Sequence, residues 1–243
     1  MMKKSLIALA ALAAFAGAAQ AQSGVNLYGI VDLGLRHSNN EGLSKGSENQ
    51  ETAGMSQSRW GINVNEDMGG GLRTLVNLEN RFSAQNGAIA NAAQWSQSWV
   101  GIQSSDFGQI RLGRQYNVLF DVMTTTYVPF KFSPYLEVFK PETIGHLSGG
   151  VTGLGSRNDN MVKYLATLGA FTFEAQVSAL QGDPTLVKSW GAAAKYGFGE
   201  LALGGGYLEE KAMNGGKAKA YNLGVGYTSG PLYLNASYAH STF

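Results

Sequence analysis

Length, composition and charge narrow the possible classes of protein before any motif is considered. The chain has 243 residues, of which 44% are hydrophobic and only 14% charged, and it has no cysteine. The hydrophobic fraction excludes a disordered chain, and the missing cysteines exclude a disulfide scaffold, an iron–sulfur cluster and a cysteine nucleophile. A formal net charge of +1 excludes a strongly basic nucleic-acid-binding protein.

The first 21 residues have the three regions of a secretory signal peptide. Lys3 and Lys4 form a positive region, residues 6–19 form an apolar run, and Ala19-Gln20-Ala21 is a cleavage site. The apolar run is too short for a transmembrane helix, which needs about 20 residues. We therefore expect residues 1–21 to be removed on export and residues 22–243 to form the mature domain.

The mature sequence alternates apolar and polar residues with a period of two. From Phe171 to Ala179 the odd positions are apolar and the even positions polar, which gives a strand one apolar and one polar face. No stretch shows comparable helical spacing. Eleven strands are predicted, at residues 25–37, 56–65, 72–82, 95–104, 109–116, 159–168, 170–180, 187–197, 200–210, 218–228 and 231–241.

Short and long connections alternate along the chain. Tight turns are predicted at 66–71, 105–108, 168–169, 198–199 and 229–230, and longer polar connections at 38–55, 83–94, 117–158, 181–186 and 211–217. Outer-membrane barrels have short periplasmic turns and long external loops in this order. No later segment is apolar enough to span a membrane as a helix, so a membrane-embedded mature chain requires a barrel.

Aromatic residues lie near many of the predicted strand ends. Amphipathic rings favour the interface between membrane and water, so we interpret these residues as an interfacial girdle, although strands are rich in aromatics in any setting. The residues are Trp60, Phe82, Trp95, Tyr164, Phe171, Tyr196, Tyr207, Tyr227 and Tyr238.

Several motifs resemble those of the general porins of Gram-negative bacteria, of the β-proteobacterial type. They are Leu27-Tyr28-Gly29-Ile30-Val31-Asp32, Ser58-Arg59-Trp60-Gly61, the turn at 66–72, Trp99-Val100-Gly101-Ile102, residues 107–115 and Ser156-Arg157-Asn158-Asp159-Asn160 with Tyr164. Each motif is weak alone, but their order and spacing are specific, and together they cover essentially the whole mature chain.

The resemblance implies an all-β, transmembrane antiparallel β-barrel of 16 strands, usually a homotrimer, with an inward-folded third external loop. The longest connection, 117–158, lies in the place of that loop, and so long a connection is generally functional. Eleven is an odd number, whereas bacterial barrels have an even number of strands, so we expect a chain that is incomplete at its C-terminus. The implied partners are outer-membrane lipid, lipopolysaccharide, ions and small hydrophilic solutes, with no cofactor and no metal.

Charged residues on the predicted polar face are the candidates for a pore filter. Arg59 and Arg157 match two arginines of the constriction in related porins, whereas Ser96-Gln97-Ser98 stands where a third is usual. A mild anion preference is therefore expected. On the wall the candidates are Arg59, Arg73, Arg81, Arg111, Arg157 and Lys163 against Glu79 and Glu174, and on the connection 117–158 they are Asp121, Glu137 and Glu142, with Lys131 and Lys140.

Acidic residues opposite a basic wall create a transverse field that orients hydrated solutes. A solvated wall position is an equally good interpretation for Arg73 and Arg81. The sequence does not assign the face of Arg114.

The predicted function is passive diffusion of ions and small hydrophilic solutes through an outer-membrane pore. One alternative is a small substrate-specific channel of about 12 strands, and another is a periplasmic, lipocalin-like binding barrel that is soluble without detergent. An outer-membrane enzyme is the least favoured, because catalysis needs a positioned base. The three histidines, His37, His146 and His240, fall in no H-E-x-x-H or G-x-S-x-G motif.

Overall fold

Most of the described part of the protein is one curved antiparallel sheet. The computed structural model describes residues 24–38, 47–52, 56–90, 94–126, 156–178, 187–212 and 216–242, so the predicted signal peptide lies outside the described residues. The eleven strands of this sheet are β1 (Gly24–Ile30), β4 (Arg59–Gly69), β5 (Leu72–Arg81), β6 (Trp95–Ser104), β7 (Gly108–Tyr116), β8 (Arg157–Leu168), β9 (Phe171–Ser178), β10 (Val187–Phe198), β11 (Leu201–Ala212), β12 (Lys217–Ser229) and β13 (Leu232–Thr242).

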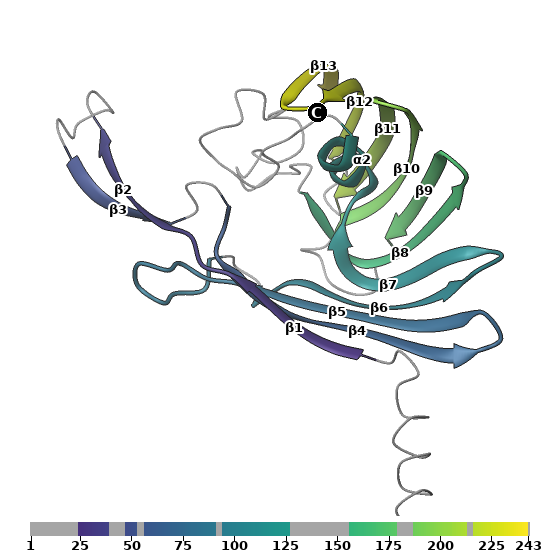
Figure 1. The fold of residues 1–243 in the computed structure, drawn as a ribbon, viewed down its shortest axis with the longest axis horizontal. Coiled ribbons are helices and arrows are strands. Elements are labelled where there is room, and N and C mark those ends of the chain that lie inside the picture. The colour runs from purple at the N-terminus through teal and green to yellow at the C-terminus, as the bar shows by residue number, and fades with distance from the viewer. Residues whose placement is uncertain are drawn as a thin grey trace, which may run out of the picture.

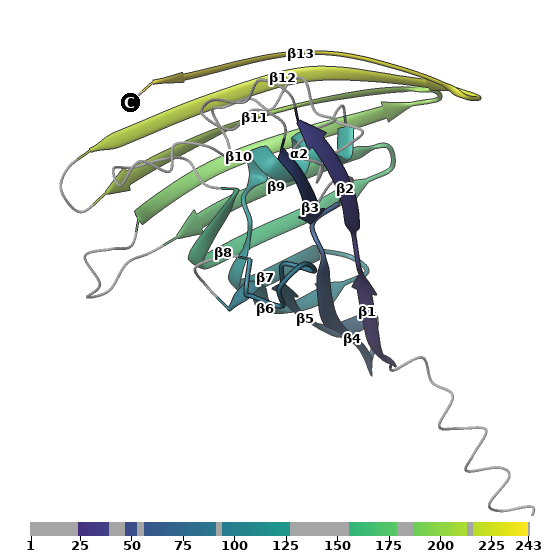
Figure 2. The ribbon, with the colours of Figure 1, turned by 90° about the vertical axis from the view of Figure 1, so that its left-hand side faces the viewer.

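Neighbours in the sheet are neighbours along the chain, in the order β1-β4-β5 and onward to β13. Figure 1 shows the sheet curving around a helix, and Figure 2 shows the strands from the side. Within the described ranges β1 and β13 are the two edges and do not pair with each other. The short hairpins all fall at one end of the sheet because the strands alternate in direction, and this confirms the predicted alternation of connections.

The predicted alternation of faces is also confirmed. On β8, Met161 and Lys163 are buried at 1% and 0% exposure, whereas Val162 and Tyr164 between them are 43% and 37% exposed. The same outward exposure of large apolar side chains recurs on the other strands of the sheet. A wall that turns its apolar face outward suits a lipid surround and not water.

Local turn chemistry explains the tightest hairpins. Between β10 and β11 the loop is Gly199-Glu200, and Gly199 has a φ of +56°. A glycine at the first central position followed by a residue of ordinary φ is the pattern of a type II′ turn, whose twist matches that of the flanking strands. The hairpins at 168–171 and 229–232 repeat the pattern.

The predicted first strand, 25–37, is divided in the structure. β1 ends at Ile30, and β2 (Leu33–Ser38) leaves the main sheet and pairs with β3 (Ser47–Thr52) as a separate hairpin. The break lies at Asp32, whose backbone N donates to Ser58 Oγ at 2.8 Å and whose carboxylate accepts from Ser56 N at 2.5 Å. β3 falls in the predicted connection 38–55, and alternation alone could not show this change of pairing partner.

No stretch of the mature sequence shows clear helical spacing, yet the structure contains a helix there. Helix α2 (Val118–Thr126) begins the long connection 117–158. Asn117 is its N-cap, accepting a hydrogen bond from Phe120 N at 2.9 Å, and Gln176 Oε1 accepts from Val118 N at 2.7 Å. These bonds satisfy backbone donors that a helix start otherwise leaves unpaired. No helix in the described part of the chain is long and apolar enough to cross a membrane.

Helix α2 packs inside the curve of the sheet, against β10, β11 and β12 (Figure 1). Its apolar side chains meet small residues and one leucine of the wall, and the clusters comprise Leu119 and Met123 with Leu208, Ala218 and Ala220, and Val118 and Val122 with Ala193. At Gly204 a Cβ atom would lie 2.7 Å from Thr126 Oγ1 and 2.9 Å from Val122 Cγ2. Only a glycine there allows so close an approach, so the wall is built to receive the helix.

Candidate pore constriction

Two arginines of the inner wall converge on one tyrosine, and a third joins them through a shared carboxylate. Arg59 (β4), Arg81 (β5) and Arg157 (β8), with Glu79 (β5) and Tyr116 (β7), form what we call the arginine cluster. Glu79 Oε1 lies 3.0 Å from Arg81 Nε, and Glu79 Oε2 lies 3.8 Å from Arg59 Nη1. Arg59 and Arg81 are register partners on adjacent strands, so Glu79 offsets a repulsion that two opposed like charges would otherwise cause.

Tyr116 holds the other side of the cluster. Its hydroxyl oxygen accepts hydrogen bonds from Arg81 Nη2 and from Arg157 Nη2, the latter at 2.7 Å. The Arg157 guanidinium also lies over the Tyr116 ring, 4.3 Å from its centre, a favourable cation–π distance. Sequence reasoning missed Tyr116, because only the pairing of β7 with β8 brings it opposite Arg157.

The cluster carries an excess of two positive charges in a dry environment. Arg59, Glu79 and Arg81 are 5%, 4% and 6% exposed. One uncompensated charge about 8 Å from a passing ion is worth about 2 kcal/mol at an effective dielectric constant of about 20, several times the thermal energy. A buried charge can therefore bias ion passage through its field without touching the solute.

Two other predicted wall cations lie apart from the cluster. Arg111 (β7) is stacked 4.4 Å from the centre of the Trp99 ring, and its Nη2 donates to Gln109 Oε1 at 3.0 Å. Arg73 is eight residues before Arg81 on β5, a separation of about 26 Å along a strand. That exceeds the screening length of about 8 Å at physiological salt, so Arg73 acts independently of the cluster.

The remaining predicted residues form a second charged group or lie outside the described residues. Lys163 (β8) pairs with Asp121 on α2 and with Glu174 on β9. Arg114, whose face the sequence left open, pairs with Asp159 at 2.5 Å and donates to Trp95 O at 3.1 Å. The residues of the connection 117–158 that lie outside the described ranges are Lys131, Glu137, Lys140 and Glu142.

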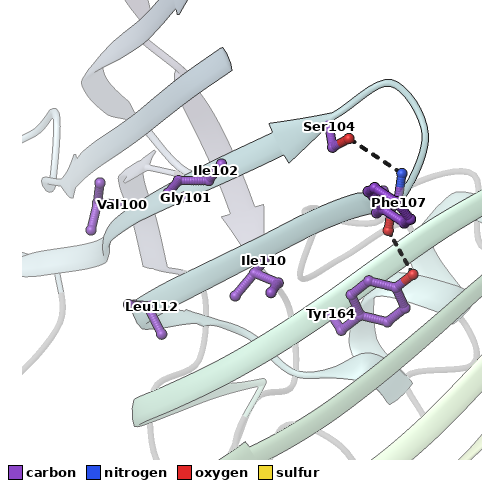
Figure 3. Close-up of a pocket in the computed structure, with 9 residues that line it drawn as sticks. Val100, Gly101, Ile102, Ser104, Phe107, Ile110, Leu112 and Tyr164 are labelled. Carbon is purple, nitrogen blue, oxygen red and sulfur yellow. Dashed lines mark hydrogen bonds between the residues drawn. The ribbon is translucent and has the colours of Figure 1, made fainter. Parts of the chain in front are cut away.

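A groove on the outer face, by contrast, offers no ionic chemistry. It has a volume of about 420 Å³ and is lined by aliphatic side chains of β6 and β7, with Phe107 and Tyr164 at its edge (Figure 3). Its polar atoms already pair with one another: Tyr164 Oη donates to Phe107 O at 2.7 Å, and Phe107 N donates to Ser104 Oγ at 3.4 Å. The charged chemistry therefore belongs to the inner face.

An apolar outer wall, short turns at one end and a charged inner wall narrowed by a helix are together the features of a porin. A family model described as Gram-negative porin matches residues 8–242. The chain belongs to the Gram-negative porin family. An outer membrane porin protein of Bordetella pertussis is 31% identical, over 98% of this chain and 59% of its own length. Outer membrane porin protein 32 of Delftia acidovorans is 32% identical, over 95% of this chain and 69% of its own length.

Solved porins share the fold. The anion-selective porin from Comamonas acidovorans has a TM-score of 0.60 at 23% identity, covering 90% of this chain and 78% of that one. OmpF of Salmonella typhi, in complex with daunomycin, has a TM-score of 0.67 at 20% identity, covering 90% and 66%. This porin-family chain thus spans about 60% to 70% of the curated relatives' lengths, and family membership places it in the outer membrane.

Proposed function

We propose that this protein forms a water-filled pore for passive diffusion of ions and small hydrophilic solutes, with a mild preference for anions. The arginine cluster carries the proposal: three guanidinium groups and one carboxylate lie together on the inner wall, beside the helix that narrows it. Such a group of fixed charges selects by sign and size, with no covalent step. The proposal accordingly assigns no catalytic residue and no enzymatic activity.

The test is ion selectivity in a planar lipid bilayer. Under a gradient of potassium chloride, the reversal potential is expected to have the sign of chloride preference. A potential of the opposite sign would overturn the anion preference, and the absence of any discrete conductance would overturn the pore itself.

Charge removal shows whether the cluster is the filter. The double variant Arg59→Ala and Arg157→Ala lowers the net charge of the cluster from +2 to zero, so the chloride preference is expected to disappear. Arg73→Ala is the matched control, because it removes one wall arginine about 26 Å away along the same sheet. Equal shifts for the control and the double variant would exclude a localised filter.

We also propose a homotrimer in contact with outer-membrane lipid and lipopolysaccharide. Support comes from the fold shared with a trimer form of OmpT from Vibrio cholerae. Chemical cross-linking of the protein in outer-membrane vesicles is expected to yield a ladder that ends at three copies. A ladder that ends at one copy would contradict the assembly while leaving the pore proposal intact.

A further inference from the structure

Lys163 occupies an unusual place for a lysine. Its side chain has 0% exposure, whereas lysines are almost never fully buried without a partner. The ammonium donates to Asp121 Oδ2 on α2, lies 3.0 Å from Glu174 Oε2 on β9, and donates to Tyr116 O at 3.3 Å. An ammonium has three donors; Asp121 and Tyr116 accept from two of them, and the ion pair with Glu174 and the complete burial of the side chain keep the charge away from a solute.

The ion pair with Asp121 joins α2 to a part of the wall that the apolar contacts do not reach. Leu119 and Met123 pack toward β11 and β12, whereas Lys163 holds the first turn of the helix from β8. The same ammonium also separates two acidic residues. Without Lys163, the carboxylates of Asp121 and Glu174 would face each other as unshielded like charges, which favours displacement of the helix.

We infer that Lys163 is a positioning residue, which clamps α2 to the inner wall and so sets the width of the passage, instead of presenting its charge to solutes. The conductance readout of this role rests on the proposed pore function, but the placement of the helix does not. The group of Lys163, Asp121 and Glu174 has a net charge of −1, so it also lowers the positive potential beside the arginine cluster. The effect of Lys163 on the width of the passage and its effect on ion selectivity can be separated by experiment.

The native sequence has no cysteine, so one introduced thiol can report whether the helix stays on the wall. Val122 is 2% exposed and faces the sheet, which makes Val122→Cys the reporter. The protein is isolated from outer membranes in detergent and treated with a water-soluble maleimide, and the labelled fraction is followed by mass spectrometry. The reporter alone is expected to be protected.

Two variants break the clamp, and one serves as a matched control. Lys163→Met removes the ammonium, and Asp121→Asn removes the helix anchor while leaving the pair of Lys163 with Glu174 in place. Lys195→Met removes another wall lysine, whose Nζ contacts Thr125 Oγ1 of the same helix at 3.3 Å. With either clamp variant the reporter is expected to label about tenfold faster, through local opening of the helix. With the control it stays protected.

The inference is overturned if both clamp variants label no faster than the control. Because Asp121→Asn is nearly isosteric and strands no lysine, it decides the question if Lys163→Met fails to fold. In bilayers, a released helix is expected to raise single-channel conductance and current noise, whereas loss of a mere surface charge shifts only the reversal potential. Labelling needs no transport, so faster labelling in a protein without conductance would count against the proposed function and not against the clamp.

Discussion

One sheet contains two walls, the first formed by β4, β5, β7 and β8 and the second by β10 to β12. Apolar and polar residues alternate in the same way in both, yet the residues that point inward differ in kind. The first wall carries the arginine cluster, and the second carries alanines and glycines beneath α2. Alternation decides only which face a residue occupies. What covers that face decides its chemistry: the apolar side chains of α2 pack on small residues and Leu208, whereas the arginine cluster lies where no described helix covers the wall.

The strongest test of this contrast is to hollow out the helix-covered wall. Leu119 is fully buried between α2 and the sheet, so Leu119→Ala is expected to lower the free energy of unfolding by about 2–5 kcal/mol. Leu223→Ala is the control, because that side chain is 65% exposed on the outer wall, where lipid can refill the space. Denaturant unfolding from micelles measures both, and equal losses would contradict the packing role.

Adding volume between the wall and α2 is also expected to destabilise the protein. Gly204→Ala places a methyl group within 3 Å of Thr126 and Val122, and such overpacking costs about 1–3 kcal/mol. Gly197→Ala is the comparison, since nothing lies within 4 Å of its Cβ position. The same unfolding measurement applies, and a Gly204→Ala protein as stable as the Gly197→Ala protein would mean that α2 does not lie against β11.

A smaller change tests the wall that carries the arginine cluster. Tyr116→Phe keeps the ring stacked on Phe120, whose centre is 4.3 Å away, but removes the oxygen that accepts from Arg81 and Arg157. Losing hydrogen bonds to charged groups costs about 1–3 kcal/mol, so both guanidiniums become less ordered. The chloride preference measured by reversal potential is expected to weaken.

The matched control for Tyr116→Phe is Tyr164→Phe. The Tyr164 hydroxyl donates to Phe107 O at 2.7 Å on the outer face of the wall, away from the arginine cluster. Loss of selectivity in both variants to the same degree would show that any wall hydroxyl matters, and would remove the special role of Tyr116.

The smallest expected effect lies in a turn, away from both walls. Hydrogen bonds from Ser229 Oγ and Tyr227 Oη, each at 2.8 Å, hold the pKa of the Glu200 carboxyl below its ordinary value. A carboxyl with a lowered pKa in the folded state stabilises the protein above its unfolded pKa, and this contribution is lost as pH falls through the folded pKa. Wild type is therefore expected to exceed Glu200→Gln in stability at neutral pH and to converge with it in acid. Denaturant unfolding over a range of pH measures the difference, and a stability difference that does not change with pH would contradict the role of Glu200.

The sequence by itself determined what depends on local geometry. Apart from the first strand, which the structure divides, the alternation of apolar and polar residues predicted the strands of the main sheet within a few residues, because successive side chains of a strand must point to opposite faces. The tight turns followed from glycines such as Gly199, whose positive φ few other residues adopt. The filter roles assigned to Arg59 and Arg157 stay predictions.

The tertiary structure decided which inward residues meet. Helix α2 was missed because its sequence, Val-Leu-Phe-Asp-Val-Met-Thr-Thr-Thr, is short and rich in β-branched residues that favour strands. The gathering of Arg81 and Arg157 at Tyr116, and the pairing of Lys163 with Asp121, join residues 35 to 76 positions apart in the sequence. A period of two assigns a face to each residue, but only strand register and the packing of α2 assign its partners.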